Sequence, residues 1–178
     1  MGRGGQAKQA AGASVRSAAR FAGAEDIPAL RELKLEVVRR TYAEFEGPAL
    51  REWEQRFCSD DYLHERIPAR PNERGEISYF YVAGPRERPE GMAALKVRDG
   101  KAYLGDIYVR RPQRSLGTKL PEQLFSEARE RGLAHAVADC FSTNEPCLRW
   151  LQKHGFEIVS GCEEGSLGVW VHRLERDL

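Results

Sequence analysis

The chain has 178 residues, enough for one domain with a buried core, and its 28 basic and 27 acidic residues leave a net charge of +1. This balance argues against a general nucleic-acid or membrane-surface role, because proteins that bind either partner usually carry a marked excess of basic residues. Four cysteines lie far apart without CxxC or zinc-finger spacing, so we expect reduced thiols in a cytoplasmic protein and no metal site. No apolar segment reaches membrane-spanning length, and the N-terminus lacks the apolar core of a signal peptide.

The first part of the chain predicts a tail followed by helices. Residues 1–14 are small and polar without an apolar period, which predicts a disordered tail and a domain over residues 15–178. Residues 15–21 are compatible with a short strand. Asp26 is suited to cap a helix over residues 27–45, where apolar residues recur at helical spacing. Residues 49–67 predict a second helical region, and residues 68–76 predict a loop.

After residue 76 the spacing of apolar residues changes from that of helices to that of β-strands. Segments 77–84, 91–99 and 101–109 are joined by polar turns and predict an antiparallel meander, with Asp99-Gly100 as a hairpin signal. A helix through Arg131 follows, then a strand over 134–141, a shorter helix over 144–155 and a pair of strands over 156–175. This order predicts an α+β or mixed α/β fold.

The turn after Val109 is the first candidate binding site. A helix N-terminus offers unpaired backbone N–H groups and a partial positive charge, which suit phosphate. The turn and first helical residues add further donors: Arg110, Arg111, Arg114, Ser115 and Thr118. A solvated basic turn without a ligand would have the same composition, so the composition alone leaves both roles open.

Two segments resemble the GNAT acetyltransferase superfamily. The strand, basic turn and "LGTKL" helix start follow the order of the family's [QR]-x-x-G-x-[GA] turn, whose amides hold the pyrophosphate of acetyl-CoA. The segment "STNEPCLRWLQKHGF" is similar to N-x-x-[AC]-x-x-[LF]-[YF]-x-K-x-G-F, and this second motif is the more specific one. It matches at five positions: Asn144, Cys147, Lys153, Gly155 and Phe156.

The resemblance implies a GNAT-like mixed, mostly antiparallel central sheet flanked by helices. It implies an N-acyltransferase that moves an acetyl or related acyl group from acetyl-CoA to a primary amine of a small molecule or protein, without a metal. Homodimers are common in the family, so a dimer would agree with the resemblance. The residues that it assigns to the co-substrate are Ile107, Val109, Arg114, Ser115, Leu116, Gly117, Thr118 and Asn144.

The pyrophosphate turn departs from the family pattern. It is shorter than the usual form, and Ser115 stands where the first of the two glycines belongs if Gly117 takes the last position. Pro121 lies just inside the helix, where a proline is tolerated in the first turn and disruptive later. We therefore expect a degenerate pyrophosphate loop, in which the helix end and the charge remain while the close backbone approach is partly lost.

Asp106 and Tyr108 are the catalytic candidates. Transfer requires a base for the amine and an acid for the leaving thiolate. Many members of the family carry a glutamate on the central strand, where this chain has Gly105. A tyrosine in the helix after the asparagine often supplies the acid, and the matching position here holds Leu151. Asp106 would face the opposite side of the sheet from Gly105 unless a β-bulge redirects it. Alternatively, Asp106 is a strand-end carboxylate that pairs with an arginine, and Tyr108 only packs.

Tyr42 and Phe45 are the substrate-binding candidates, because they follow the first helix, where relatives shape the acceptor pocket; a solvated helix end is the alternative. The four histidines have no carboxylate partner in a catalytic triad, which argues against a hydrolase. Two other functions stay open. One is a GNAT-fold binding or regulatory protein without turnover, and the other is an acyltransferase with a donor other than acetyl-CoA.

Overall fold

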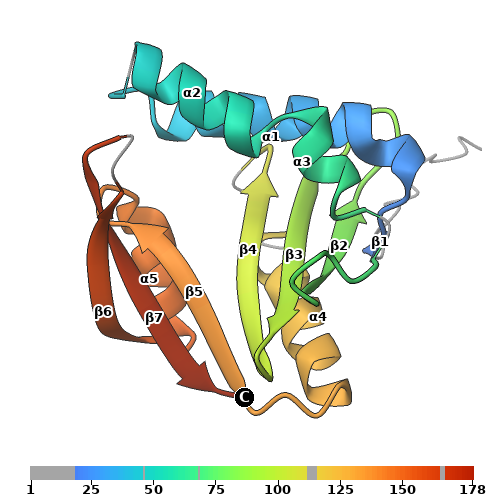
Figure 1. The fold of residues 1–178 in the computed structure, drawn as a ribbon, viewed down its shortest axis with the longest axis vertical. Helices are drawn as coiled ribbons and strands as arrows, with labels where there is room; N and C mark the ends of the chain where they lie inside the picture. The colour runs from blue at the N-terminus through green and yellow to red at the C-terminus, as the bar shows by residue number, and fades with distance from the viewer. Residues whose placement is uncertain (1–18, 46, 68, 112–115, 165–166) are drawn as a thin grey trace, which may run out of the picture.

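The computed structural model describes residues 19–45, 47–67, 69–111, 116–164 and 167–178, and its centre is a seven-stranded sheet in the order β1-β2-β3-β4-β5-β7-β6 (Figure 1). Neighbouring strands are antiparallel except β4 and β5, which are parallel. The predicted mixed, mostly antiparallel sheet is therefore confirmed. The strands are β1 (Arg20–Phe21), β2 (Ile77–Ala83), β3 (Gly91–Arg98), β4 (Lys101–Val109), β5 (His135–Phe141), β6 (Glu157–Glu164) and β7 (Val169–Asp177).

Helices flank the sheet, as Figure 1 shows. Helices α1 to α3 lie across the ends of β2, β3 and β4, while α4 and α5 lie behind the sheet in this view. A short 3₁₀ turn, η1, directly precedes α1. Within the described residues, no helix is both long and apolar enough to cross a membrane. The bounds are η1 (Ala24–Asp26), α1 (Ile27–Thr41), α2 (Pro48–Phe57), α3 (Asp60–His64), α4 (Leu116–Glu130) and α5 (Glu145–Lys153).

The core has a cluster on each face of the sheet, because successive side chains of a strand point to opposite faces. On β2, Tyr81 belongs to the cluster that contains Leu124 of α4. Its neighbour Phe80 belongs to the cluster that contains Leu33 of α1. The helices of each face therefore pack against their own set of strand residues, and the face that carries α1 and α3 also carries the cleft described below.

Two N-terminal predictions need correction. Asp26 does not cap α1, because its carboxylate accepts hydrogen bonds from the guanidinium of Arg20, at 2.7 Å to each oxygen, and from the backbone N–H of Gly23 at 2.8 Å. The second helical region divides into α2 and α3. A new helix can start at this point because the Ser59 hydroxyl accepts the backbone N–H of Tyr62 at 3.1 Å.

Helix α4 continues past its proline, although a proline beyond the first turn was expected to disrupt it. Pro121 has no N–H to donate to the carbonyl four residues earlier. Leu120 and Leu124 on the same helix are fully buried against the sheet. Burial of this apolar face offsets the missing hydrogen bond, since burying one leucine side chain contributes roughly 1.5–3 kcal/mol.

Candidate functional site

A β-bulge in β4 directs Asp106 toward the face that carries α1 and α3. Met92 of β3 lies opposite Tyr108, and Ala94 lies opposite Gly105, so two residues of β4 share the place opposite one residue of β3. Asp106 has a φ of 48°, a left-handed conformation that aspartate tolerates better than most residues. From the sequence, Asp106 was expected to face away from Gly105 unless a β-bulge redirected it. The bulge is present, and the Asp106 side chain lines the same cleft as Gly105.

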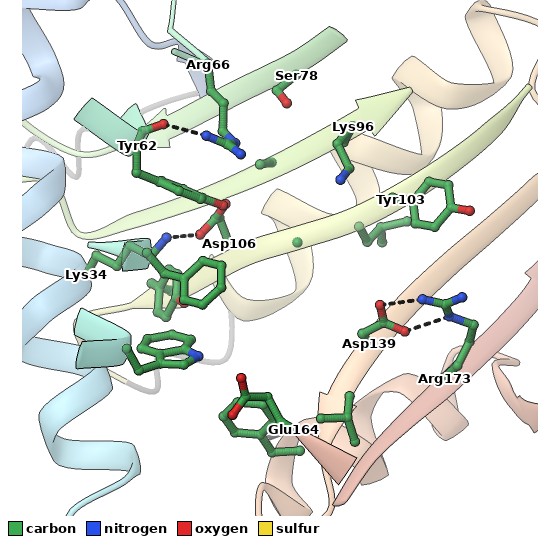
Figure 2. Close-up of a pocket in the computed structure, with 18 of the residues that line it drawn as sticks. Lys34, Tyr62, Arg66, Ser78, Lys96, Tyr103, Asp106, Asp139, Glu164 and Arg173 are labelled. Atoms are coloured by element: carbon green, nitrogen blue, oxygen red, sulfur yellow. Dashed lines mark hydrogen bonds and ion pairs between the residues drawn. The ribbon is translucent and has the colours of Figure 1, made fainter. Parts of the chain in front are cut away.

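Asp106 is held by two residues that the sequence analysis did not single out. Lys34 of α1 forms an ion pair with one carboxylate oxygen, and the Tyr62 hydroxyl donates to the other at 2.9 Å. The ammonium group of Lys34 lies 4.1 Å from the ring centroid of Tyr62 and 5.3 Å from that of Tyr108. We call Lys34, Tyr62, Asp106 and Tyr108 the Asp106 cluster, of which Figure 2 labels the first three. The ion-pair partner of Asp106 is a buried lysine and not the arginine that the alternative role named.

Burial keeps the neutral groups of this region protonated. Desolvation, strengthened by the negative charge of Asp106, raises the pKa of Tyr62 and of Tyr108 well above the ordinary value. Burial also raises the pKa of the Cys58 thiol, which packs nearby, to about 11. Tyr62 is therefore a hydrogen-bond donor and Cys58 is not a thiolate nucleophile at neutral pH. The carboxylate of Asp106 is the group of the cluster that can accept a proton.

The Asp106 cluster borders a cleft of about 780 Å³. The rings of Trp53 and Phe57 lie 5.0 Å apart on one wall, and Trp53 also reaches Phe141 of β5 at 6.2 Å. Gly105 is part of the lining, and a Cβ built there would meet no atom within 4 Å. The cleft thus combines an apolar aromatic wall with a carboxylate on the bulge and open space above β4, which suits a small ligand.

Strands β4 and β5 separate beside this cleft. Their parallel pairing covers only three positions, from Ala102 with Ala136 to Leu104 with Ala138. Among the described residues, β4 from Gly105 to Val109 has no partner on its β5 side. Unpaired backbone N–H and C=O groups need partners, so this edge can bind an extended polar chain.

The predicted co-substrate residues lie along this opening as far as the structure describes them. Ile107 packs toward the core on the α4 side, and the carbonyl of Val109 accepts a hydrogen bond from Arg40 at 3.1 Å. Leu116, Gly117 and Thr118 form the first turn of α4. Arg114 and Ser115 lie outside the described residues, as does the part of the loop expected to be degenerate.

Asn144 and Tyr42, predicted for different ligands, contact each other. The Asn144 side chain caps α5 by accepting the N–H of Cys147 at 3.3 Å, and its amide donates to the Tyr42 hydroxyl at 3.0 Å. The Tyr42 ring packs on Phe141 at 5.2 Å, and Phe45 packs on Tyr42 at 6.3 Å. Tyr42, Phe45 and Asn144 do not line the cleft, so in this conformation they join α1 to the end of β5.

The position expected to supply an acid is filled by a core residue. Leu151 is buried in the cluster on the α4 and α5 side and has no proton to donate. Among the described residues, no group of three or more His, Cys, Asp or Glu side chains is placed to hold a metal ion. The polar chemistry beside the opening of β4 and β5 therefore centres on Asp106.

The sheet is mixed and opens between its two parallel strands, β4 and β5. A helix N-terminus follows β4, and the cleft lies beside the opening. This arrangement defines the GNAT-like transferase fold. The model of the Acetyltransferase (GNAT) family matches residues 47–156, and the chain belongs to this family. A search of curated proteins finds no match.

Solved structures share the fold at low sequence identity. PaiA N-acetyltransferase from Thermoplasma acidophilum, solved with coenzyme A, is 19% identical with a TM-score of 0.76, over 90% of this chain and 98% of that one. An N-acetyltransferase from Staphylococcus aureus Mu50 is 15% identical with a TM-score of 0.65, over 89% and 96%. A putative streptothricin acetyltransferase from Bacillus anthracis, solved with acetyl coenzyme A, is 21% identical with a TM-score of 0.52, over 65% and 68%.

Proposed function

We propose that this protein is an N-acetyltransferase that transfers the acetyl group of acetyl-CoA to a primary amine. The observation that carries the proposal is the unpaired edge of β4 beside a cleft into which the bulge directs Asp106. Family membership supports it, as do the two relatives that were solved with coenzyme A or acetyl coenzyme A.

The co-substrate would enter through the opening of β4 and β5. Its pantetheine arm can form backbone hydrogen bonds along β4 at Ile107 and Val109. Its pyrophosphate suits the first turn of α4, where backbone N–H groups and the helix dipole favour an anion. We assign this contact to Leu116, Gly117 and Thr118, with charge from Arg114 and a hydroxyl from Ser115. Asn144, at the start of α5 on the other side of the opening, would border the arm.

The reaction is a direct displacement. The amine nitrogen forms a bond to the thioester carbonyl carbon, the C–S bond breaks, and coenzyme A leaves as a thiolate. Asp106 takes the proton of the attacking ammonium, directly or through one water, because its two present partners leave acceptor capacity on the carboxylate. Tyr108, with its raised pKa, is a weak acid, so its role is to shape the site and to pack on Lys34. The nitrogen loses its second proton as the amide forms, and water relays that proton to the thiolate.

Two features favour a binding protein without turnover as the second candidate. The position of the usual acid is the buried Leu151, and the carboxylate of Asp106 is engaged by Lys34. Binding of CoA without any acetylated product would support this candidate. Product formation only with another acyl-CoA or an aminoacyl donor would instead identify a different donor.

The test combines mass spectrometry of an amine panel with acetyl-CoA and the variant Asp106→Asn. We expect acetylated product from the wild type and a kcat lowered by at least about 100-fold in the variant, with CoA affinity retained. Asp60→Asn is the control, since Asp60 lies on α3 with a half-exposed carboxylate and does not line the cleft. An Asp106→Asn variant that folds and retains full kcat would refute the assignment of the base.

A further inference from the structure

Two of the four cysteines come together where β5 is followed by α5. Cys140 is the last residue but one of β5, and Cys147 stands in the first turn of α5. Both side chains pack in or against the core cluster on the α4 and α5 side of the sheet, and both are free thiols. A spacing of seven positions, from 140 to 147, is not that of a CxxC motif, so only the fold reveals the pair.

Asn144 contacts both cysteines. Its carbonyl oxygen is 3.9 Å from the sulfur of Cys140, and its side-chain oxygen accepts the backbone N–H of Cys147 at 3.3 Å. The thiol of Cys140 also donates a hydrogen bond to the sulfur of Cys147. The two sulfur atoms are therefore neighbours, at a point where Asn144 holds the end of β5 and the start of α5 together.

The surroundings make Cys147 the better nucleophile of the pair. The hydrogen bond from Cys140 lowers the pKa of Cys147, against the effect of burial. The same hydrogen bond, together with burial, raises the pKa of Cys140. Cys147 also lies at a helix N-terminus, where backbone N–H groups and the helix dipole stabilise a thiolate. A thiolate at Cys147 beside a protonated Cys140 is thus the favoured ionised state of the pair.

Solvent access differs between the two thiols in the same sense. Cys147 is half-buried, so a small reagent can reach its sulfur, whereas Cys140 is 5% exposed and lies behind it. The other two cysteines do not share this arrangement, because Cys58 is buried with a raised pKa and Cys162 is exposed on β6. Thiolate character and access together decide which cysteine reacts, and Cys147 has both.

We propose that Cys140 and Cys147 form a reactive dithiol, which a low-molecular-weight disulfide oxidises to an internal disulfide bond. The pair would be a site of thiol–disulfide exchange in addition to the acetyl-transfer site. This inference does not depend on the proposed acetyltransferase function, because it uses neither Asp106 nor the co-substrate.

The exchange has two steps. The Cys147 thiolate attacks one sulfur of the small disulfide, whose S–S bond breaks, and the first small thiol leaves with the proton that Cys147 has lost. Cys140 then gives up its proton and attacks the Cys147 sulfur of the mixed disulfide, so that the second small thiol leaves and takes that proton. Two protein thiols are oxidised, and one small disulfide is reduced to two thiols.

The first test uses the reduced full-length protein with oxidised glutathione at neutral pH, followed by alkylation of the remaining thiols and mass spectrometry. We expect the tryptic peptide that contains Cys140 and Cys147 to lose two hydrogen atoms and to resist alkylation. This change should appear at least about tenfold faster than addition of glutathione to Cys162 in the same sample.

Variants of Cys140 test the roles of the two thiols. In Cys140→Ser and Cys140→Ala the second step is impossible, so glutathione should stay attached to Cys147. Serine keeps a hydrogen-bond donor for the Cys147 thiolate and alanine does not, so the adduct should form faster in Cys140→Ser. Cys147→Ser should give no internal disulfide and leave the buried Cys140 unmodified. Cys162→Ser is the matched control and should form the disulfide at the wild-type rate.

The wild-type result does not depend on how well a variant folds, and circular dichroism checks that each variant is folded. Alkylation of both Cys140 and Cys147 after glutathione treatment, with an adduct on Cys162, would overturn the inference. So would a Cys140–Cys147 disulfide that forms only in urea, because the pair would then be unreactive in the folded protein. An unmodified Cys147 in folded Cys140→Ser would also refute its role as the attacking thiolate.

Discussion

Replacing Lys34 by methionine should destabilise the protein strongly, although methionine suits the apolar surroundings of the lysine side chain. The side chain of Lys34 is 1% exposed and that of Asp106 is 11% exposed, so water cannot replace the lost charge. Removing one partner of a buried ion pair costs about 3–5 kcal/mol, because the other charge stays buried without compensation. The cost should fall near the upper end, since two aromatic contacts of the ammonium group are lost as well.

The double variant Lys34→Met/Asp106→Asn separates this charge effect from loss of packing. The amide oxygen of the introduced asparagine would keep an acceptor for the Tyr62 hydroxyl while both charges are gone, so we expect the double variant to recover to within about 1–2 kcal/mol of the wild type. Asp106→Asn alone should be nearly as unstable as Lys34→Met alone, because it leaves a buried ammonium.

The assay is urea unfolding of the four proteins, followed by circular dichroism, at one neutral pH. Each single variant should lose more unfolding free energy than the double variant does, which corresponds to a coupling energy of several kcal/mol between the two residues. A Lys34→Met cost below about 1 kcal/mol, or single costs that simply add, would show that the pair is solvated and would refute the reasoning.

The remaining predictions use the same structure. Gly105→Ala should fold normally and gain roughly 0.4–1 kcal/mol in unfolding free energy, since the new Cβ meets open space and φ is not positive; a loss in urea unfolding would contradict this. Burial raises the pKa of the Cys58 thiol to about 11, so the neutral thiol stabilises the folded protein at neutral pH, and this contribution is lost as pH rises from about 9 through 11. Cys58→Ala should therefore flatten the alkaline decline of the urea midpoint. The hydrogen bond from Arg20 lowers the pKa of Asp26, so its stabilisation is present above about pH 4 and is lost on acidification; Asp26→Asn should flatten the acid limb of unfolding free energy against pH. Arg114→Ala should weaken CoA binding about tenfold to 100-fold by calorimetry, and equal affinity would remove Arg114 from the site.

Local signals in the sequence predicted most of the sheet. The hairpin at Asp99-Gly100 is an example, because both residues adopt the positive φ values, 51° and 71°, that the dipeptide favours. The C-terminal end of α4 is another, since Gly132 takes a φ of 71° as expected of a C′ glycine. Both features depend on neighbouring residues alone, so the sequence contains the information directly.

The partners of Asp106 depend on contacts between distant segments. Lys34 lies 72 positions before Asp106 and Tyr62 lies 44 before it, and neither contact follows from local propensity. One signal was present: Lys34 interrupts the apolar face of α1 between Leu30 and Val37, where a buried lysine requires a counter-charge. The bulge depends on the register between β3 and β4, which the alternating pattern does not fix at a single residue.

The short pairing between β4 and β5 has a mechanical consequence. With only three positions joined, the sheet consists of two leaves hinged at Ala102–Leu104, and each leaf keeps its own antiparallel hydrogen bonds. At the far end of the opening, the leaves meet through the Tyr42–Asn144 hydrogen bond and the Tyr42–Phe141 ring contact. Rotation about this hinge would spread the leaves by releasing these contacts of Tyr42 and the Trp53–Phe141 ring contact, without breaking a strand pair in either leaf.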